Sequence, residues 1–178
     1  MGLRKGNAYS KRPVVPYTRI SKRKGKAYIK TVPPQSIVKF SMGSEKMHND
    51  MKLTHELTMV ATEKVQIRHN ALEACRQFIN KQLDEALAGQ YLFRVVPFPH
   101  HIQRENKMLT GAGADRMSSG MQLSFGRPMG KAAIVNVGGK IFFLALPNEK
   151  AVKLAREVLQ KIKAKLPCKT KVLYELKK

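Results

Sequence analysis

The sequence has little of what secreted, disulfide-stapled or membrane-spanning proteins contain. It has no tryptophan and only two cysteines, Cys75 and Cys168, in 178 residues. These cysteines lie far apart and form no Cys-x-x-Cys pair, which argues against a disulfide scaffold or a zinc knuckle and favours a reducing, cytoplasmic setting. The longest apolar run, Ile141 to Leu146, is far shorter than the roughly 18 residues that span a bilayer. No apolar segment follows the basic N-terminus, so we expect no secretory signal.

Acidic residues are also scarce. The chain has 12 Asp and Glu against 34 Lys and Arg, which gives a formal net charge of +22. Charge of this size repels itself unless a polyanion neutralises it. Nucleic acid is the partner that we expect. An anionic membrane is less suited, because the prolines near the N-terminus oppose an amphipathic helix there.

Residues 1–36 are predicted to form a basic N-terminal extension that binds RNA. The first acidic residue is Glu45, and four prolines interrupt residues 1–36. Apolar residues are too few to build a core, while Arg and Lys interleaved with tyrosines can hold phosphates and stack on unpaired bases. The candidate RNA-binding residues here are Arg4, Lys5, Tyr9, Lys11, Arg12, Arg19, Lys22, Arg23, Lys24 and Lys26.

Residues 37–178 are predicted to form a single α+β domain. Apolar residues at spacings of three or four predict a helix over 68–88 with buried Leu72, Cys75, Ile79, Leu83 and Ala86, and Gly89 follows as its C′ residue. A second helix is expected from Glu149 to about Lys165, capped by the Asn148 side chain, with Ala151, Ala155, Val158, Ile162 and Leu166 buried.

Strands are expected over 37–40, 53–61, 91–96 and 172–176. Gly138-Gly139, between 132–137 and 140–146, predicts a β-hairpin. The predicted fold class is therefore α+β. It is a two-layer sandwich of antiparallel or mixed strands with two main helices, plus the basic extension and a long internal loop.

The internal loop, about residues 101–121, has an unusual composition. From Glu105 the sequence reads ENKMLTGAGADRMSSGMQLSFGRPMGKAA, with five glycines and several cations but no hydrophobic period. Long loops inside small domains are often functional, and cations in a glycine-rich setting can contact phosphate closely. The candidate RNA-binding residues of this region are Arg104, Lys107, Arg116, Arg127 and Lys131.

No motif for bond chemistry, a cofactor or a metal is present. GAGADR lacks the last glycine of a dinucleotide fingerprint, and the histidines have no ligand-like spacing. We therefore expect no catalytic residue, no cofactor and no metal site. Two alternatives stay open: a basic RNA-processing enzyme that uses Glu105 or Asp115 as general acid or base, and a protein that binds membranes or other polyanions.

Between His100 and Ala133, the runs ENKML, GAGADR and SGMQLSFGRPMGKAA resemble the large-subunit ribosomal proteins called L-ten-e in archaea and eukaryotes. The bacterial counterpart of that family is L-sixteen. The opening, Arg4, Tyr9 and Lys11-Arg12-Pro13, is similar too, and the resemblance extends over essentially the whole chain. Eukaryotic members continue beyond Glu175, so the resemblance implies a chain of the archaeal type.

The resemblance implies a structural constituent of the large ribosomal subunit, in the cytoplasm, that supports translation without bond chemistry. Its implied partners are large-subunit ribosomal RNA, transfer RNA in the A site with the P site as a further candidate, and neighbouring ribosomal proteins, with no membrane. It also implies that Arg104 to Arg116 points towards the peptidyl-transferase region.

Overall fold

The computed structural model describes Ser10, residues 31–105 and residues 127–177. Two antiparallel sheets and three α-helices make up this part of the chain. In chain order the elements are β1 (Ser41–Gly43), α1 (Glu45–Asn49), β2 (His55–Ala61), β3 (Val65–Arg68), α2 (His69–Leu87), β4 (Leu92–Val95), β5 (His101–Glu105), β6 (Arg127–Val135), β7 (Lys140–Leu146), α3 (Glu149–Ile162), the 3-10 turn η2 (Lys163–Lys165) and β8 (Thr170–Leu176).

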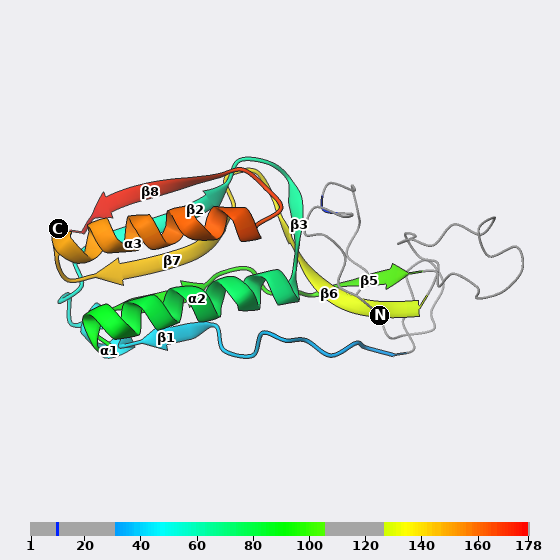
Figure 1. Cartoon of the computed structure of the whole chain (residues 1–178), viewed down its shortest axis with the longest axis horizontal. Helices are drawn as coiled ribbons and strands as arrows, with labels where there is room; N and C mark the ends of the chain where they lie inside the picture. The colour runs from blue at the N-terminus through cyan, green and yellow to red at the C-terminus, as the bar shows by residue number, and fades with distance from the viewer. Residues whose placement is uncertain (1–9, 11–30, 106–126, 178) are drawn as a thin grey trace, which may run out of the picture.

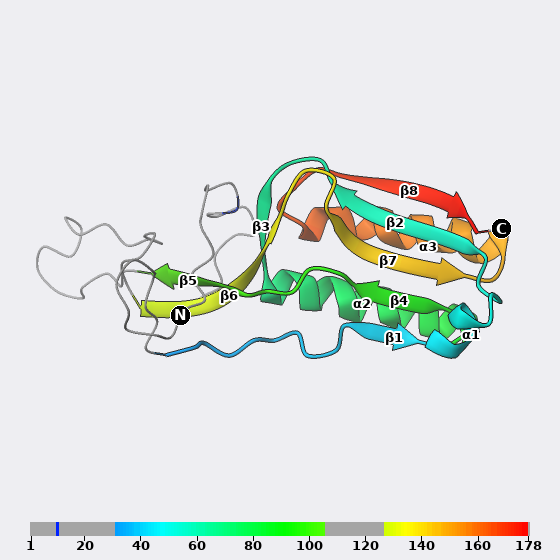
Figure 2. The ribbon, with the colours of Figure 1, turned by 180° about the vertical axis from the view of Figure 1, so that it is seen from behind.

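The larger sheet has five strands in the order β1-β4-β7-β2-β8. The two main helices, α2 and α3, cover one of its faces, as the front and back views show (Figure 1, Figure 2). Every strand pairing is antiparallel. The predicted α+β fold with two main helices is confirmed.

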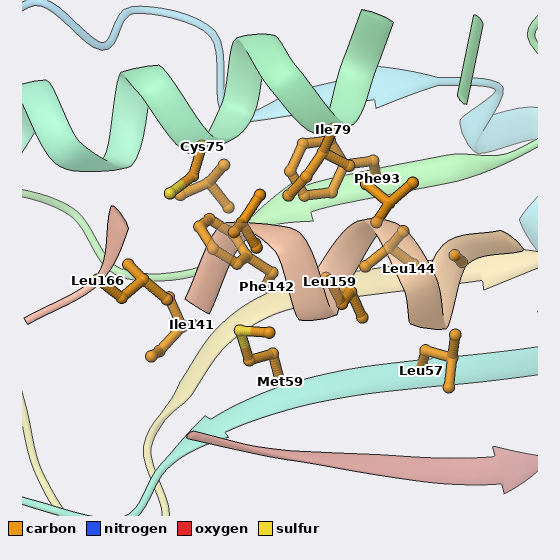
Figure 3. Close-up of a cluster of buried hydrophobic side chains, with 14 of the residues drawn as sticks. Leu57, Met59, Cys75, Ile79, Phe93, Ile141, Phe142, Leu144, Leu159 and Leu166 are labelled. Carbon is orange, nitrogen blue, oxygen red and sulfur yellow. The ribbon is translucent and has the colours of Figure 1, made fainter. Parts of the chain in front are cut away.

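The core lies between these helices and the sheet (Figure 3). Cys75 and Ile79 from α2 and Leu159 from α3 meet Phe142 and Leu144 of β7, and all five are fully buried. The predicted apolar stripes explain this, since residues three or four apart share one helix face. Burial also raises the pKa of the Cys75 thiol to about 12, so Cys75 is a packing residue rather than a nucleophile.

Ile79→Ala should lower the free energy of unfolding by roughly 2–5 kcal/mol, because it leaves a cavity in this core. Ile79 has no exposed surface in the fold. Urea denaturation would measure the loss, and Lys81→Ala, an exposed change on the same helix, is the control with a cost within about 0.5 kcal/mol. A loss for Ile79→Ala no larger than that of the control would contradict the packing described here.

The smaller sheet has three strands in the order β3-β6-β5 and extends from the end of the body where α2 begins (Figure 2). Its strand β3 leads directly into α2, so Val65 and Ile67 of β3 still join the main core. Farther along, β5 and β6 continue beyond α2 as a two-stranded ribbon (Figure 1). The backbone N–H of Gln66 on the outer edge of β3 donates to the carbonyl of Ser10 at 2.8 Å.

The predicted hairpin around Gly138-Gly139 is wrong. The strands on its two sides, β6 and β7, do not pair with each other and belong to different sheets. The Gly139 N–H donates to the Asn136 carbonyl at 2.9 Å, so the turn centres on Val137 and Gly138, with a φ of 77° at Gly138. A turn with positive φ at only its third residue resembles type II, which splays the flanking strands, whereas a hairpin favours a primed turn. The Gly138 N–H donates to the Ala61 carbonyl of β2 at 2.8 Å, and the Ala61 N–H donates to the Gly139 carbonyl at 3.0 Å.

Other predictions of elements and their boundaries also need correction. Residues 37–40 are not a strand: β1 begins at Ser41, although Ile37 is fully buried. Residues 101–105, predicted to start the internal loop, form β5. The short strand β3 and the single-turn helix α1 were not predicted at all, because each has too few residues to show a period.

The helix ends differ in detail from the predictions. Ala86 is exposed, and Leu87 packs against the core in its place. Gly89 does follow α2 with a φ of 83°, as expected of a C′ residue. Asn148 is the N-cap of α3, but its side chain makes no capping hydrogen bond, and its carbonyl accepts the first helical bond from Val152.

Candidate nucleic-acid interface

Three of the predicted RNA-binding residues lie on the smaller sheet. Arg104 is on β5, and Arg127 and Lys131 are on β6. Arg127 is exposed, and the other two are partly buried. The register places Glu105 opposite Arg127 at the tip of the ribbon, so the segment 106–126 leaves and rejoins the described fold at this point.

The register of the ribbon shifts beside Arg104. Gln103 pairs with Gly130 while Arg104 pairs with Pro128, so β6 has one extra residue, Met129. A bulge of this kind bends the strand and turns the following side chains. It also accommodates Pro128, which has no N–H to donate to a ladder. The bulge thus changes the direction of Arg104 and Arg127 relative to the rest of the sheet.

The start of α2 lies beside this ribbon and adds further cations. Arg68 is the N-cap, its side chain makes no capping bond, and the first turn contains no acidic residue. The Arg68 Nε and Nη1 atoms are buried and make no hydrogen bond within the part of the chain that the structure describes. A helix N-terminus carries partial positive charge, and acidic groups normally stabilise it. Here the cation Arg68 stands at the cap instead, which leaves this end of α2 suited to an external anion.

His69 connects α2 to two neighbouring segments. Its Nδ1 atom accepts from the Ser36 backbone N–H at 3.0 Å and lies 3.0 Å from the Ser36 hydroxyl. On the other side β6 passes closely, since a Cβ on Gly130 would lie 3.2 Å from Nε2. Burial, and then the charges of Arg68 and Lys131, lower the pKa of His69. Arg68 and Lys131 therefore both lie near enough to the His69 ring to affect its pKa. Together they form a single positive region.

Polar side chains are buried on the smaller sheet itself. Gln103 of β5 donates through Nε2 to Oε1 of Gln66 on β3 at 3.2 Å, and both residues are buried. His101 is buried beside them, and burial, with a smaller effect of His100, lowers its pKa to about 4. The Gln66–Gln103 bond ties the two outer strands together across β6, which keeps the cations of the ribbon in fixed positions.

Acid should weaken the fold through His101. A histidine whose folded pKa is about 4 and whose unfolded pKa is 6.5 favours folding fully above pH 6.5. This contribution is lost as the pH falls from 6.5 to 4, at a cost of about 3 kcal/mol. Urea denaturation at pH 7 and pH 4.5 should show a smaller difference for His101→Gln than for the unchanged protein. His100→Gln, at the exposed neighbouring position, is the control, and an unchanged pH dependence in His101→Gln would contradict the assignment.

The other predicted site residues lie outside the described residues. These are Arg4, Lys5, Tyr9, Lys11, Arg12, Arg19, Lys22, Arg23, Lys24, Lys26, Lys107 and Arg116. Their binding role stays a prediction. Arg68 and His69 were missed, although one signal was present: two adjacent cationic or titratable residues stand where a helix N-terminus usually has acids.

In the described ranges, no helix is long and apolar enough to cross a membrane. Across the same residues, no three His, Cys, Asp or Glu side chains come together as a metal-ligand group. What gathers at the end of the body with the smaller sheet is positive charge, from Arg68, Arg104, Arg127 and Lys131.

The sequence is similar to known proteins over nearly its whole length. The family of ribosomal protein L16p/L10e matches residues 15–173. A large ribosomal subunit protein uL16 from Sulfolobus acidocaldarius is 41% identical, over 97% of this chain and 93% of the relative. The protein of that name from Thermofilum pendens is 41% identical, over 98% of both chains. The one from Nanoarchaeum equitans is 42% identical, over 93% of this chain and 89% of the relative.

Proposed function

The chain belongs to the ribosomal protein L16p/L10e family, and we propose that it is a structural constituent of the large ribosomal subunit that binds ribosomal RNA through the end carrying the smaller sheet. The observation that carries this proposal is the positive region at the start of α2. The buried Arg68 Nε and Nη1 atoms lack a hydrogen-bond acceptor in the described part of the chain. Burial lowers the pKa of the adjacent His69, and the charges of Arg68 and Lys131 lower it further. A phosphate would supply the missing acceptor and charge.

The mechanism is electrostatic. Cations of the ribbon and of residues 1–36 neutralise phosphates, which lets RNA helices approach each other. Neutralisation releases counterions, so affinity falls with salt by roughly 0.7–0.9 in log–log slope for each phosphate contacted. The protein makes and breaks no covalent bond, and we expect it in the cytoplasm, within the ribosome.

The finer location is near the A-site transfer RNA and the peptidyl-transferase region. Its support is the family resemblance of residues 100–133 together with the fold, because β5 and β6 deliver both ends of segment 106–126 to the tip of the ribbon. A two-stranded ribbon is a firm base from which such a segment can reach into RNA. Ribosomal RNA, A-site transfer RNA and neighbouring ribosomal proteins are the partners in this proposal, with P-site transfer RNA as a further candidate.

Reconstitution tests the proposal directly. Large subunits stripped of this chain by high salt should bind less A-site transfer RNA, and adding the purified chain back should restore that binding. Particles that keep full A-site binding without the chain would contradict the proposed location.

Arg116→Ala and Lys107→Ala should impair this restoration while leaving the melting temperature of the free protein nearly unchanged, because the sequence predicts both residues to lie outside the core. Thermal denaturation of each free variant and A-site binding after reconstitution are the two measurements. A large loss of thermal stability in either variant would contradict that placement.

A further inference from the structure

The outer edge of β8 is the second surface that the fold leaves available. β8 is the last strand of the five-stranded sheet and pairs only with β2 among the described strands. Its side chains are unusually apolar for an exposed edge. Leu173 is 46% exposed, Tyr174 is 42% exposed and Leu176 is 54% exposed.

The hydrogen-bond pattern identifies the free backbone groups of this edge. The Thr62 N–H donates to the Lys169 carbonyl at 3.1 Å, and the Lys177 N–H donates to the Thr54 carbonyl at 2.8 Å. The register between these two bonds is unbroken, so odd-numbered residues of β8 bond to β2. In an antiparallel ladder the intervening residues point their N–H and C=O groups away. Thr170, Val172, Tyr174 and Leu176 therefore present a regular row of donors and acceptors outwards.

Side chains on the two faces of β8 differ in chemistry. Tyr174 shares the helix face with Leu176, and it is held there by a 2.8 Å contact from its hydroxyl to His55 Nδ1 and by Arg156, whose Cζ lies 5.4 Å from the ring centre. The opposite face carries Lys171, Leu173 and Glu175, with Lys169 and Lys177 next to the two ends of the strand. A segment lying along this edge would meet apolar groups on one face and mostly lysines on the other.

We propose that the edge of β8 binds an extended segment of a partner protein, in which acidic residues alternate with apolar ones. Such a segment would add a sixth strand to the sheet, with main-chain bonds for affinity and alternate side chains for specificity. Its acidic residues would face Lys171 and Lys177, and its apolar residues would cover Tyr174 and Leu176.

Two other occupants fit less well. A second copy of this chain would bring its own lysines against these lysines, and edge lysines oppose such self-pairing. RNA has no row of backbone amides to match, so it would leave the outward N–H and C=O groups of the edge largely unused. The edge is distinct from the positive region at the start of α2, so this proposal and the proposed function can fail separately.

A synthetic peptide alternating Glu and Val, of the same length as β8, tests the proposal with the full chain. On binding, the amide protons of Val172, Tyr174 and Leu176 should become protected from hydrogen exchange. The amides of Lys171, Leu173 and Glu175 already bond to β2 and should change little. This alternation of even and odd residues is the signature of an added strand.

The controls use composition and charge. A peptide with the same residues in two blocks should not protect the even-numbered amides. Lys171→Glu with Lys177→Glu should weaken binding about tenfold, whereas Lys46→Glu with Lys150→Glu, at exposed sites on other elements, should not. The proposal is overturned if the peptide leaves the even-numbered amides unprotected. It is also overturned if single-stranded RNA or a second copy of the chain protects those amides while the peptide does not.

Discussion

Gly43→Ala is expected to lower the free energy of unfolding by about 4 kcal/mol. Gly43 has a φ of 86°, where a residue with a side chain is strained. A Cβ built there would lie 2.0 Å from the carbonyl oxygen of Tyr91. Positive φ and overpacking each cost about 1–3 kcal/mol.

Tyr91 cannot move away cheaply. Its ring is fully buried, and its hydroxyl donates to Asp84 Oδ1 at 2.6 Å, with Asn80 Oδ1 at 3.0 Å. Its carbonyl accepts from the Ser44 N–H at 2.8 Å. A shift of Tyr91 would therefore break bonds to α2 and to the start of α1 together.

Gly89→Ala is the matched control. Gly89 has nearly the same φ, 83°, but nothing lies within 4 Å of a Cβ built on it. This variant should show only the conformational cost, about 1–2 kcal/mol. Urea denaturation of both variants separates the two causes, and equal losses would show that the contact with Tyr91 contributes nothing.

The second large effect concerns RNA. Replacing Arg104, Arg127 and Lys131 together by glutamine should weaken binding to large-subunit ribosomal RNA on the order of a hundredfold at about 0.15 M salt. Each lost phosphate contact removes roughly 0.7–0.9 from the slope of log affinity against log salt, so the slope should fall by about 2–3. Filter binding over a range of salt concentrations measures both quantities.

A control with the same net charge removes three lysines elsewhere. Lys46, Lys52 and Lys150 are exposed and lie in or beside α1 and in the first turn of α3. Both helices begin at the end of the body away from the smaller sheet (Figure 1). Their replacement by glutamine should leave the slope nearly unchanged. If the two triple variants lose affinity equally, RNA binding depends only on the total charge of the protein, and the ribbon is not a specific binding surface.

The sequence was sufficient to predict the elements in which apolar residues repeat with a helical period over many residues. The stripes of α2 and α3 predicted most of their buried faces, because 14 to 19 residues give several turns of pattern. Ala86 is exposed although it was predicted to be buried, and Val152 and Leu159 are buried although they were not predicted. A period describes one element and its buried face. It contains no information about which strands pair.

The sequence pattern led to a wrong prediction of which strands pair. Gly138-Gly139 between two β-rich runs is a strong local hairpin signal, yet the turn centres one residue earlier and bonds to Ala61 of β2. The chain therefore passes from the smaller sheet to the larger one. The division into two sheets depends on contacts between residues far apart in the sequence, such as His101 with Ala132 and Val65 with Val135.

The candidate site was predicted in part for the same reason. Composition marked Arg104, Arg127 and Lys131 as cations next to a glycine-rich segment, and the structure places all three on one ribbon. Arg68 lies 36 residues before Arg104 in the chain, and its place beside Lys131 follows from the pairing of β3 with β6. Without that pairing, nothing in the sequence connects the start of α2 to the ribbon.

Cross-linking from Arg127 in intact large subunits tests the central claim most directly. A photoreactive residue at the exposed position 127 should capture nucleotides of large-subunit ribosomal RNA, while the same residue at position 150, on the opposite end of the body, should capture far fewer. Capture of RNA at position 150 and none at position 127 would contradict the account.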